Sequence, residues 1–362
     1  MVVDDSITAR TVHSRIVTGG DDMIVVAIAG TAEQAMHLLG SVRVDVILLD
    51  LEMPGIGGLD ALPGIIAAAR GARIMVVSSL TVDGAEQTVA ALAQGAADTL
   101  PKPVAGTFND LYCETLRAKI RALGCASAPR AGALAALTGY AAPDLHAAPN
   151  LSASPNLRAG SGRRPQALAI GASTGGIHAL SQLFGALPKG IAVPILVTQH
   201  LPASFMPIFA RQLQTVSGCD AIVGEDDTEL VPGRIIIAPG DAHLTVRAHG
   251  GTVRIRLDRS PAPSGCTPSV DPMFASLAEV YGADTLGVVL SGMGRDGAAG
   301  AARIVAAGGA LFAQDQASCA VWGMPRAIAE AGLASAILPP DQIALRIAAS
   351  MRAAPARTAA WK

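Results

Sequence analysis

The sequence predicts an α/β protein with two doubly wound parallel sheets, one in each half of the chain. Short aliphatic runs alternate with stretches in which apolar residues recur at helical spacing, which is the pattern of βαβ units. Hydrophobic residues make up 51% of the chain, yet only 3% of it is aromatic. That balance favours parallel strands buried on both faces and built from aliphatic side chains. At 362 residues, the chain is long enough for two domains.

The composition excludes several classes of function and location. The net charge of −2 provides no basic surface for nucleic acid or an anionic membrane. No apolar run approaches the roughly 18 residues of a membrane-spanning helix, and no signal-peptide pattern is present. The five cysteines are scattered and form no C-x-x-C pair, so they indicate neither a disulfide framework nor a zinc site. We therefore expect a cytoplasmic protein that is not inserted in the membrane.

The first third of the chain alternates between predicted strands and helices. Strand-like runs cover residues 23–29, 44–49, 73–77 and 96–100, with helical patterns between them. Ahead of them, Val2-Val3 is typical of the tail of a first strand whose beginning is missing. These runs predict an open parallel sheet.

Polar residues stand where these predicted strands end. Asp4 and Asp5 follow the first strand, Asp50 follows the third, Ser78 ends the fourth, and Lys102 follows the fifth. In an open parallel sheet, sites are built at this carboxyl edge. Three carboxylates gathered there repel one another, and a hard cation such as Mg²⁺ would relieve the repulsion.

The order of these residues resembles that of response-regulator receiver domains. The resemblance is carried by Asp4-Asp5, by residues 49–54, by Ser78 and by Lys102-Pro103. It implies a flavodoxin-like domain that is phosphorylated on Asp50, with Mg²⁺ held by the three aspartates. It also assigns the supporting hydroxyl to Ser78 and the phosphate-pairing amine to Lys102.

Two features depart from the receiver pattern. The first strand is truncated, which is expected to weaken the edge of the sheet. Thr99 stands where receivers often carry an aromatic switch residue. We therefore expect phosphorylation to be coupled to its output in a different way.

A change of composition predicts the boundary between two domains. A helix is expected over residues 107–123, which closes a receiver domain at 1–123. Residues 124–164 are then rich in Ala, Pro, Gly, Ser and Asn. Such a stretch cannot bury enough surface to offset its ordering entropy, so it predicts a flexible linker, with a transient helix near 131–137. The second domain is expected at 165–352, followed by a tail at 353–362.

The stretch 166–200 organises this second domain. An aliphatic run at 167–170 is followed by Gly171-Ala172-Ser173-Thr174-Gly175-Gly176 and then by apolar residues at helical spacing. Ser173 therefore lies in a Gly-x-Ser-x-Gly turn between a strand and a helix, which is the setting of a nucleophile elbow. Backbone N–H groups near Thr174, together with the turn at Met293, are expected to stabilise an oxyanion.

Other interpretations of the hexapeptide remain open from these residues alone. A P-loop is disfavoured, because Ile177 and His178 stand where Lys and Ser/Thr are required. A dinucleotide fingerprint is disfavoured, because Ser173 occupies the position of its second glycine. A plain strand-to-helix turn with an idle serine stays possible.

A general base is expected at the same edge of the sheet. The predicted strand at 194–198 ends in Gln199-His200, which brings His200 to the edge that carries Ser173. His178 lies on the helix after the elbow, and His243 and His249 lie in a predicted hairpin, so these three are weaker candidates.

A carboxylate is expected to orient His200. Asp296 follows the strand at 285–290 and precedes a helix. It can therefore also be explained as an N-cap, and Asp241 and Asp271 are rival carboxylates. Spacing alone leaves this choice open.

Several segments together resemble the chemotaxis protein-glutamate methylesterase family. They are residues 171–176, 198–200, 268–271, 292–297 and 322–326. With the receiver pattern in front, the resemblance covers the chain except the linker, and it implies a triad of Ser173, His200 and Asp296. One departure is Cys266-Thr267, where relatives commonly carry more polar or basic residues; this change is expected to affect docking of the receptor helix.

The resemblance implies a phosphorylation-regulated hydrolase. Its substrates would be glutamate γ-methyl esters of methyl-accepting chemoreceptors, releasing methanol, and certain receptor glutamines, which it would deamidate. A chemotaxis histidine kinase would supply the phosphate, and hydrolysis would need no cofactor. Two alternatives are a receiver-controlled esterase or peptidase with another acyl substrate, and a phospho-dependent interaction module without activity.

Overall fold

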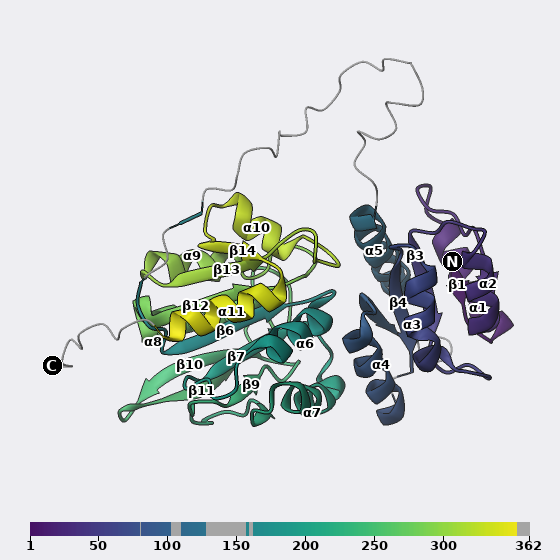
Figure 1. Ribbon diagram of the computed structural model, residues 1–362. Helices are drawn as coiled ribbons and strands as arrows, with labels where there is room; N and C mark the ends of the chain where they lie inside the picture. Colours follow the sequence, from purple (N-terminus) through teal and green to yellow (C-terminus); the bar gives the residue numbers. More distant parts are fainter. Residues whose placement is uncertain (80, 103–109, 128–156, 159–161, 353–362) are drawn as a thin grey trace, which may run out of the picture.

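The protein folds into two α/β domains (Figure 1). The structure is a computed structural model that describes residues 1–79, 81–102, 110–127, 157–158 and 162–352. Most of the predicted linker, the transient helix at 131–137, Pro103 and the tail at 353–362 lie outside these residues. Among the described helices, none is both long enough and apolar enough to cross a membrane.

The N-terminal sheet is parallel and, within the described residues, has the strand order β2-β1-β3-β4-β5. Its strands are β1 (Val2–Val3), β2 (Ile28–Ala29), β3 (Val46–Asp50), β4 (Arg73–Ser78) and β5 (Asp98–Pro101). Its helices are α1 (Ile7–Thr18), α2 (Ala32–Leu39), α3 (Gly58–Ala68), α4 (Val82–Gln94) and α5 (Asp110–Ser127). The chain order of the strands reverses between β1 and β3, so a crevice forms at the carboxyl ends of these two strands.

The second strand is shorter than the run at 23–29 predicted. Only Ile28 and Ala29 form β2, because β1 offers only Val2 and Val3 as partners. The residues before Ile28 therefore have no strand beside them, and a cavity of about 410 Å³ lies between them and β3. The length of β1 thus limits the length of its neighbour.

Helix α5 continues past the predicted end at residue 123 and reaches Ser127. Leu123 is fully buried, and Gly124 lies close enough to Val46 that even a Cβ atom there would be in van der Waals contact with it. Packing against the sheet therefore outweighs the low helix propensity of glycine.

The C-terminal domain contains a second parallel sheet with, in the described residues, the order β14-β13-β12-β6-β7-β9-β8. Its strands are β6 (Ala167–Ala172), β7 (Ile195–Gln199), β8 (Ala221–Val223), β9 (Ile235–Ile237), β12 (Thr285–Val289), β13 (Ala310–Gln314) and β14 (Ala336–Leu338). A separate antiparallel hairpin is formed by β10 (His243–His249) and β11 (Thr252–Asp258). Strand β6 lies at the point where the strand order reverses, which is where ligands bind in such sheets.

Helices cover both faces of this sheet (Figure 1). They are α6 (Gly176–Ala186), α7 (Met206–Ser217), α8 (Val270–Tyr281), α9 (Ala298–Ala306), α10 (Met324–Glu330) and α11 (Pro340–Met351), with short 3-10 turns at Ala203–Phe205 and Gly282–Asp284. Along β6, Leu168 and Ile170 pack with α6, α7 and α11, whereas Ala167 and Ala169 pack with α8 and α9. Burial of both faces explains why the strands appear in the sequence as continuous aliphatic runs.

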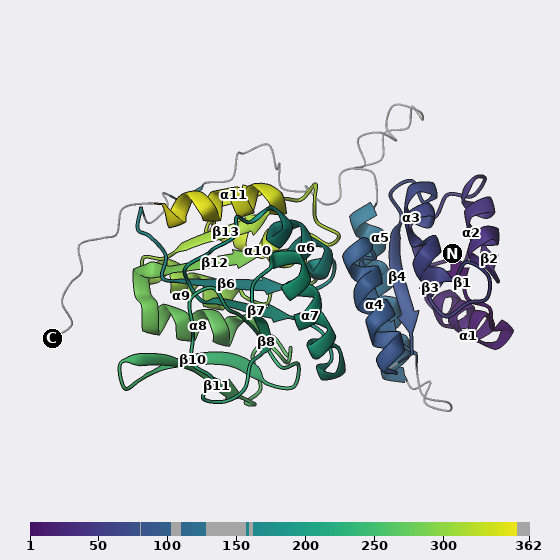
Figure 2. The same cartoon turned by 60° about the horizontal axis from the view of Figure 1, so that its bottom comes forward.

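The receiver-like domain packs against the second domain through α4, which faces it in Figure 2, and through Asp98 of β5. Helix α4 contacts α6 and α7, and His178 Nδ1 lies 2.8 Å from the carbonyl oxygen of Ala93. At the rim, Arg211 pairs with Glu86 at 2.6 Å. Both contact partners in the second domain lie on helices next to the predicted elbow, so the first domain covers this part of the sheet edge.

Candidate active site

Ser173 lies in a tight turn between β6 and α6. Gly175 has a φ of +76°, and a side chain there would collide with Ala320 and Ser291. At Gly176, a Cβ atom would collide with the amide oxygen of Gln199. The glycines therefore allow a sharp turn in a crowded place, which brings Ser173 to the carboxyl edge of the sheet.

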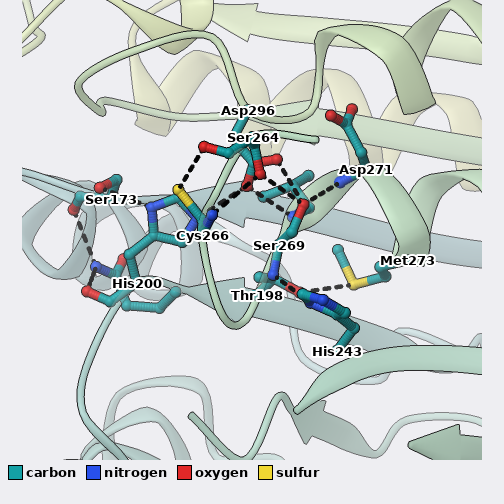
Figure 3. A network of polar contacts seen from close by, with 12 residues as sticks. Ser173, Thr198, His200, His243, Ser264, Cys266, Ser269, Asp271, Met273 and Asp296 are labelled. Carbon is teal, nitrogen blue, oxygen red and sulfur yellow. Dashed lines mark hydrogen bonds and ion pairs between the residues drawn. The ribbon is translucent and has the colours of Figure 1, made fainter. Parts of the chain in front are cut away.

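Three side chains form one hydrogen-bonded chain at this edge (Figure 3). His200 Nδ1 lies 3.1 Å from Ser173 Oγ, and His200 Nε2 lies 2.9 Å from Asp296 Oδ2. An ionised carboxylate can only accept a hydrogen bond, so Nε2 carries the proton that faces Asp296. In the neutral ring, Nδ1 then has a lone pair directed at the serine hydroxyl. This is the arrangement of an activated nucleophile.

Asp296 is buried and is held by donors from a different segment. Ser269 Oγ donates to its Oδ1 at 2.7 Å, and the N–H of Val270 donates to Oδ2 at 2.8 Å. Burial alone raises the pKa of Asp296, but the hydrogen bonds from His200, Ser269 and Val270 outweigh it and lower the pKa to about 2. The carboxylate therefore stays charged at neutral pH.

The environment of His200 favours its protonated form. Burial lowers the pKa of His200, but contacts with Asp296 and Cys266 act more strongly in the opposite direction and raise it to about 9. Cys266 thus lies beside the imidazole, with its Sγ within 4.8 Å of ligand atoms of His200 and Asp296. The sequence connected this residue only with receptor docking.

The rival candidates lie elsewhere. Asp241 is exposed and pairs with Arg259 at 3.4 Å. Asp271 accepts from the N–H of Gly300 at 2.7 Å, and its carboxylate points away from His200 (Figure 3). Among the described residues, His178 and His243 are bonded to the carbonyl oxygens of Ala93 and Ser260 and not to Ser173, and His249 is exposed at the end of β10.

The sequence did not single out Ser269 as a residue that holds Asp296. Ser269 is also the N-cap of α8, where its side chain accepts from the N–H of Asp271. Ser269 belongs to the segment 268–271, which resembles the methylesterase family, but the resemblance assigned no role to this serine. A serine before a helix is explained by capping alone, so its second partner could not be inferred.

Two backbone N–H groups beside the nucleophile remain candidates for binding an oxyanion. Within the described residues, the N–H groups of Thr174 and Met293 have no hydrogen-bond partner. The turn that carries Met293 passes directly beside the nucleophile, because a Cβ atom at Gly292 would collide with Ser173. Both groups therefore lie on the segments that flank the serine.

Comparison with known proteins agrees with this geometry. Residues 1–111 match the response regulator receiver domain model, and residues 168–347 match the CheB methylesterase model. A protein-glutamate methylesterase/protein-glutamine glutaminase of Caulobacter vibrioides is 42% identical over 355 residues, which cover 97% of this chain and 98% of that protein. The chain belongs to the CheB methylesterase family.

Two further relatives are similar to this chain. A protein-glutamate methylesterase/protein-glutamine glutaminase of Paramagnetospirillum magneticum is 40% identical over 360 residues, covering 95% of this chain and 93% of that protein. The crystal structure of the Thermotoga maritima CheB methylesterase catalytic domain is 38% identical, covers 51% of this chain and 97% of that chain, and has a TM-score of 0.49.

The receiver domain of this family member contacts the elbow directly. Thr174 Oγ1 donates to Asp98 Oδ2 at 2.7 Å, and the N–H of Gly175 donates to the carbonyl of Ala97 at 2.6 Å. Asp98 is also paired with Lys119 at 2.8 Å. Strand β5 of the receiver therefore holds the residues that immediately follow the nucleophile.

The receiver carries a cluster of carboxylates at its own sheet edge. One oxygen each of Asp4, Asp5 and Asp50 lie within 4.8 Å of one another. Among the described residues, Asp4 Oδ2 is buried and has no hydrogen-bond partner. Buried polar atoms normally have one, so an oxygen-ligated cation such as Mg²⁺ fits this set.

Asp50 is almost fully buried and is contacted by the predicted lysine. Lys102 Nζ lies 2.6 Å from Asp50 Oδ2, and the N–H of Glu52 donates to Oδ1 at 3.0 Å. Burial raises the pKa of Asp50, while Lys102 and Glu52 act in the opposite direction. Ser78 is bonded instead to Thr88 of α4, whose hydroxyl donates to it at 2.5 Å. The Ser78 hydroxyl is thus linked to α4, the helix at the domain interface.

We predict that the His200 ring titrates well above its ordinary value of 6.5, with a midpoint near the pKa of about 9. The ring is charged below this pH and neutral above it, so His200 stabilises the fold fully below about 6.5 and loses this contribution as the pH rises through 9. Histidine C–H resonances followed by NMR against pH measure the midpoint. Cys266→Ala should lower it; an unchanged midpoint in this variant would contradict the assigned cause.

We also predict that metal dependence is confined to the receiver. Chelating Mg²⁺ should stop phosphorylation of Asp50 by a small phosphodonor, since the three aspartates would otherwise repel the incoming phosphoryl group. Phosphorylation is measured as acyl phosphate formed on the full chain, and Asp4→Asn should weaken its dependence on Mg²⁺ concentration. Hydrolysis by a fragment that begins near Arg164 should not change on chelation, and a fragment that is inactivated would refute this division.

Proposed function

We propose that this chain is a phosphorylation-regulated hydrolase of glutamate γ-methyl esters on methyl-accepting chemoreceptors. The observation that carries the proposal is the hydrogen-bonded chain from Ser173 through His200 to Asp296 in a member of the CheB methylesterase family. Its partners would be the receptors and a chemotaxis histidine kinase, and it would act in the cytoplasm. The same site would deamidate certain receptor glutamines.

The reaction follows from the roles of the three residues. In its neutral form, His200 takes the hydroxyl proton on Nδ1 as Ser173 Oγ attacks the γ-carbonyl carbon of the ester, and Asp296 holds the imidazolium that forms. The N–H groups of Thr174 and Met293 stabilise the negative oxygen, and one such donor contributes about 3 kcal/mol. His200 then returns the proton to the leaving methanol.

The acyl-enzyme is released by the same groups acting in reverse. His200 removes a proton from water, the hydroxide attacks the acyl carbon, and the proton passes to Ser173 as the ester bond breaks. The receptor retains a glutamate carboxylate. A glutamine substrate follows the same course with ammonia as the leaving group.

Regulation would act on the turn after the nucleophile. In the unphosphorylated chain, Asp98 of β5 bonds Thr174, and Ala97, the residue before β5, bonds Gly175, so the receiver covers the elbow. A phosphoryl group on Asp50 would attract Lys102 and the Ser78 hydroxyl. Ser78 would then leave Thr88, and the change would pass to α4 at the domain interface.

The triad assignment predicts a graded set of losses. Ser173→Ala should abolish methanol release, because no other hydroxyl occupies the end of the chain from His200. Asp296→Asn should lower kcat by about 10⁴-fold, because an amide can hold the wrong tautomer of the ring. Methanol released from methylated receptor is the measurement, and folding is checked by circular dichroism.

Asp241→Asn is the matched control, since Asp241 is a carboxylate on the same domain that pairs only with Arg259 among the described residues. It should retain close to full activity. A larger loss in Asp241→Asn or Asp271→Asn than in Asp296→Asn would mean that the third member of the triad is assigned wrongly. Hydrolysis of simple esters without methanol release from receptor would favour another acyl substrate.

The domain contact predicts that the resting receiver inhibits. A small phosphodonor should increase the rate of the full chain, and Asp50→Ala should remove this response. Asp98→Ala should raise the rate of the unphosphorylated chain, because Thr174 loses its bond to β5, while the phosphorylated rate changes little. Glu86→Ala is the control, since it breaks only an exposed pair at the rim of the interface.

A fragment lacking residues 1–123 should also run faster than the resting full chain. Because Thr99 replaces an aromatic switch residue, we predict the direction of activation by phosphorylation and not its size. If the fragment is slower than the resting chain, the receiver contributes to catalysis or receptor docking, and the inhibitory model fails.

A further inference from the structure

Three side chains of different chemistry converge at one end of the triad. A ring nitrogen of His200, the Sγ of Cys266 and a carboxylate oxygen of Asp296 all lie within 4.8 Å of one another. They come from the end of β7, from the loop before α8 and from the turn after β12, and Figure 3 shows them side by side. The described part of the chain has only one other such group, which is the all-oxygen cluster of the receiver.

Hydrolysis gives Cys266 no role. The proton path runs from Ser173 to His200 Nδ1, and the other ring nitrogen faces Asp296. The thiol lies beside the imidazole ring, and it also makes a weak contact with the carbonyl of Ser264, at 3.9 Å. A sulfur, a nitrogen and an oxygen ligand form a mixed set that suits Zn²⁺ and similar borderline cations rather than Mg²⁺.

We propose that His200, Cys266 and Asp296 form a binding site for a thiophilic divalent cation such as Zn²⁺, and that the bound cation switches hydrolysis off. The ligands are Cys266 Sγ, His200 Nε2 and one oxygen of Asp296. The His200 side chain is 18% exposed and Cys266 is half-buried, so the cation is accessible and a water can complete a tetrahedral set.

The inhibition follows from where the ring proton goes. In the neutral ring, Nε2 carries the proton and Nδ1 has the lone pair that accepts the proton of Ser173. A cation on Nε2 displaces the proton there and binds the Nε2 lone pair, so in the neutral ring the single remaining proton lies on Nδ1. The ring then donates toward Ser173 and cannot act as its base.

Metal binding also releases protons from two of the ligands. Cys266 loses its thiol proton to solvent, and a charged His200 loses one of its two ring protons, so affinity rises with pH. Asp296 exchanges its bond to Nε2–H for a bond to the cation. Ser269 Oγ–H and the N–H of Val270 continue to hold it, as donors commonly do behind a ligating carboxylate.

The binding test uses Co²⁺ as a coloured substitute for Zn²⁺. Titration into the full chain should produce the near-ultraviolet absorption of a thiolate–cobalt bond, and Zn²⁺ should remove it. Cys266→Ala should abolish the band, whereas Cys219→Ala, a half-buried cysteine at the end of α7, should retain it. A chain that gives no band, or a band that survives in Cys266→Ala, overturns the site.

The activity test separates inhibition at this site from effects on the receiver. Zn²⁺ should stop methanol release by the phosphodonor-activated chain, and a chelator followed by fresh Mg²⁺ should restore it. Loss of a supporting residue alone costs about 10–100-fold in metal affinity, so Cys266→Ala should need at least about tenfold more Zn²⁺ for the same inhibition.

Equal sensitivity of Cys266→Ala and the native chain would overturn the inhibitory role. The effect on activity rests on the proposed hydrolysis, whereas the cobalt band does not. A chain that binds Co²⁺ through Cys266 but releases no methanol would therefore refute the proposed function and leave the metal site standing. Cobalt binding without inhibition by Zn²⁺ would refute the switch.

Discussion

The geometry of the catalytic edge depends on one buried charge. Asp296 is only 3% exposed, and a carboxylate removed from water is stable only if hydrogen-bond donors replace the water. Its donors are His200 after β7, Ser269 in the loop before α8 and the first backbone N–H of α8. Satisfying this one group therefore draws three separate segments together. The orientation of His200, the position of α8 and the place of the Cys266 loop all follow from it.

The turn from Ser173 to Gly176 has two roles. It must be tight enough to present a hydroxyl, and its glycines allow this because neighbouring side chains leave no space for a Cβ atom. The receiver then uses this turn as its contact surface, through Thr174 and Gly175. The residue that contacts β5, Thr174, is thus the neighbour of Ser173 in the sequence. A shift of β5 would therefore act on the turn directly.

Local pattern was enough to predict the parallel sheets and the turn that carries Ser173, because these depend on residues close in sequence. It was not enough to choose Asp296 over Asp241 and Asp271, because all three stand near a turn and any of them could serve as a cap. Contacts between the two domains, and contacts made by the long loops, could not be predicted from it. Asp98 meets Thr174, and Cys266 meets His200, only because two sheets and a loop are packed together. The short β2 was missed for a related reason, since its length is set by its partner strand.

The bond from the Gly175 N–H to the Ala97 carbonyl joins two backbones and not two side chains. Point substitutions replace side chains and leave peptide groups in place, so mutation at either position cannot remove the donor or the acceptor, short of proline at Gly175. Substitution can strengthen or weaken the side-chain bond between Asp98 and Thr174, whereas the backbone bond between Gly175 and Ala97 persists as long as the turn before α6 and the residue before β5 keep their positions. Related sequences with this fold would thus keep the backbone bond between the two domains, and they would differ mainly in the strength of the side-chain bond beside it.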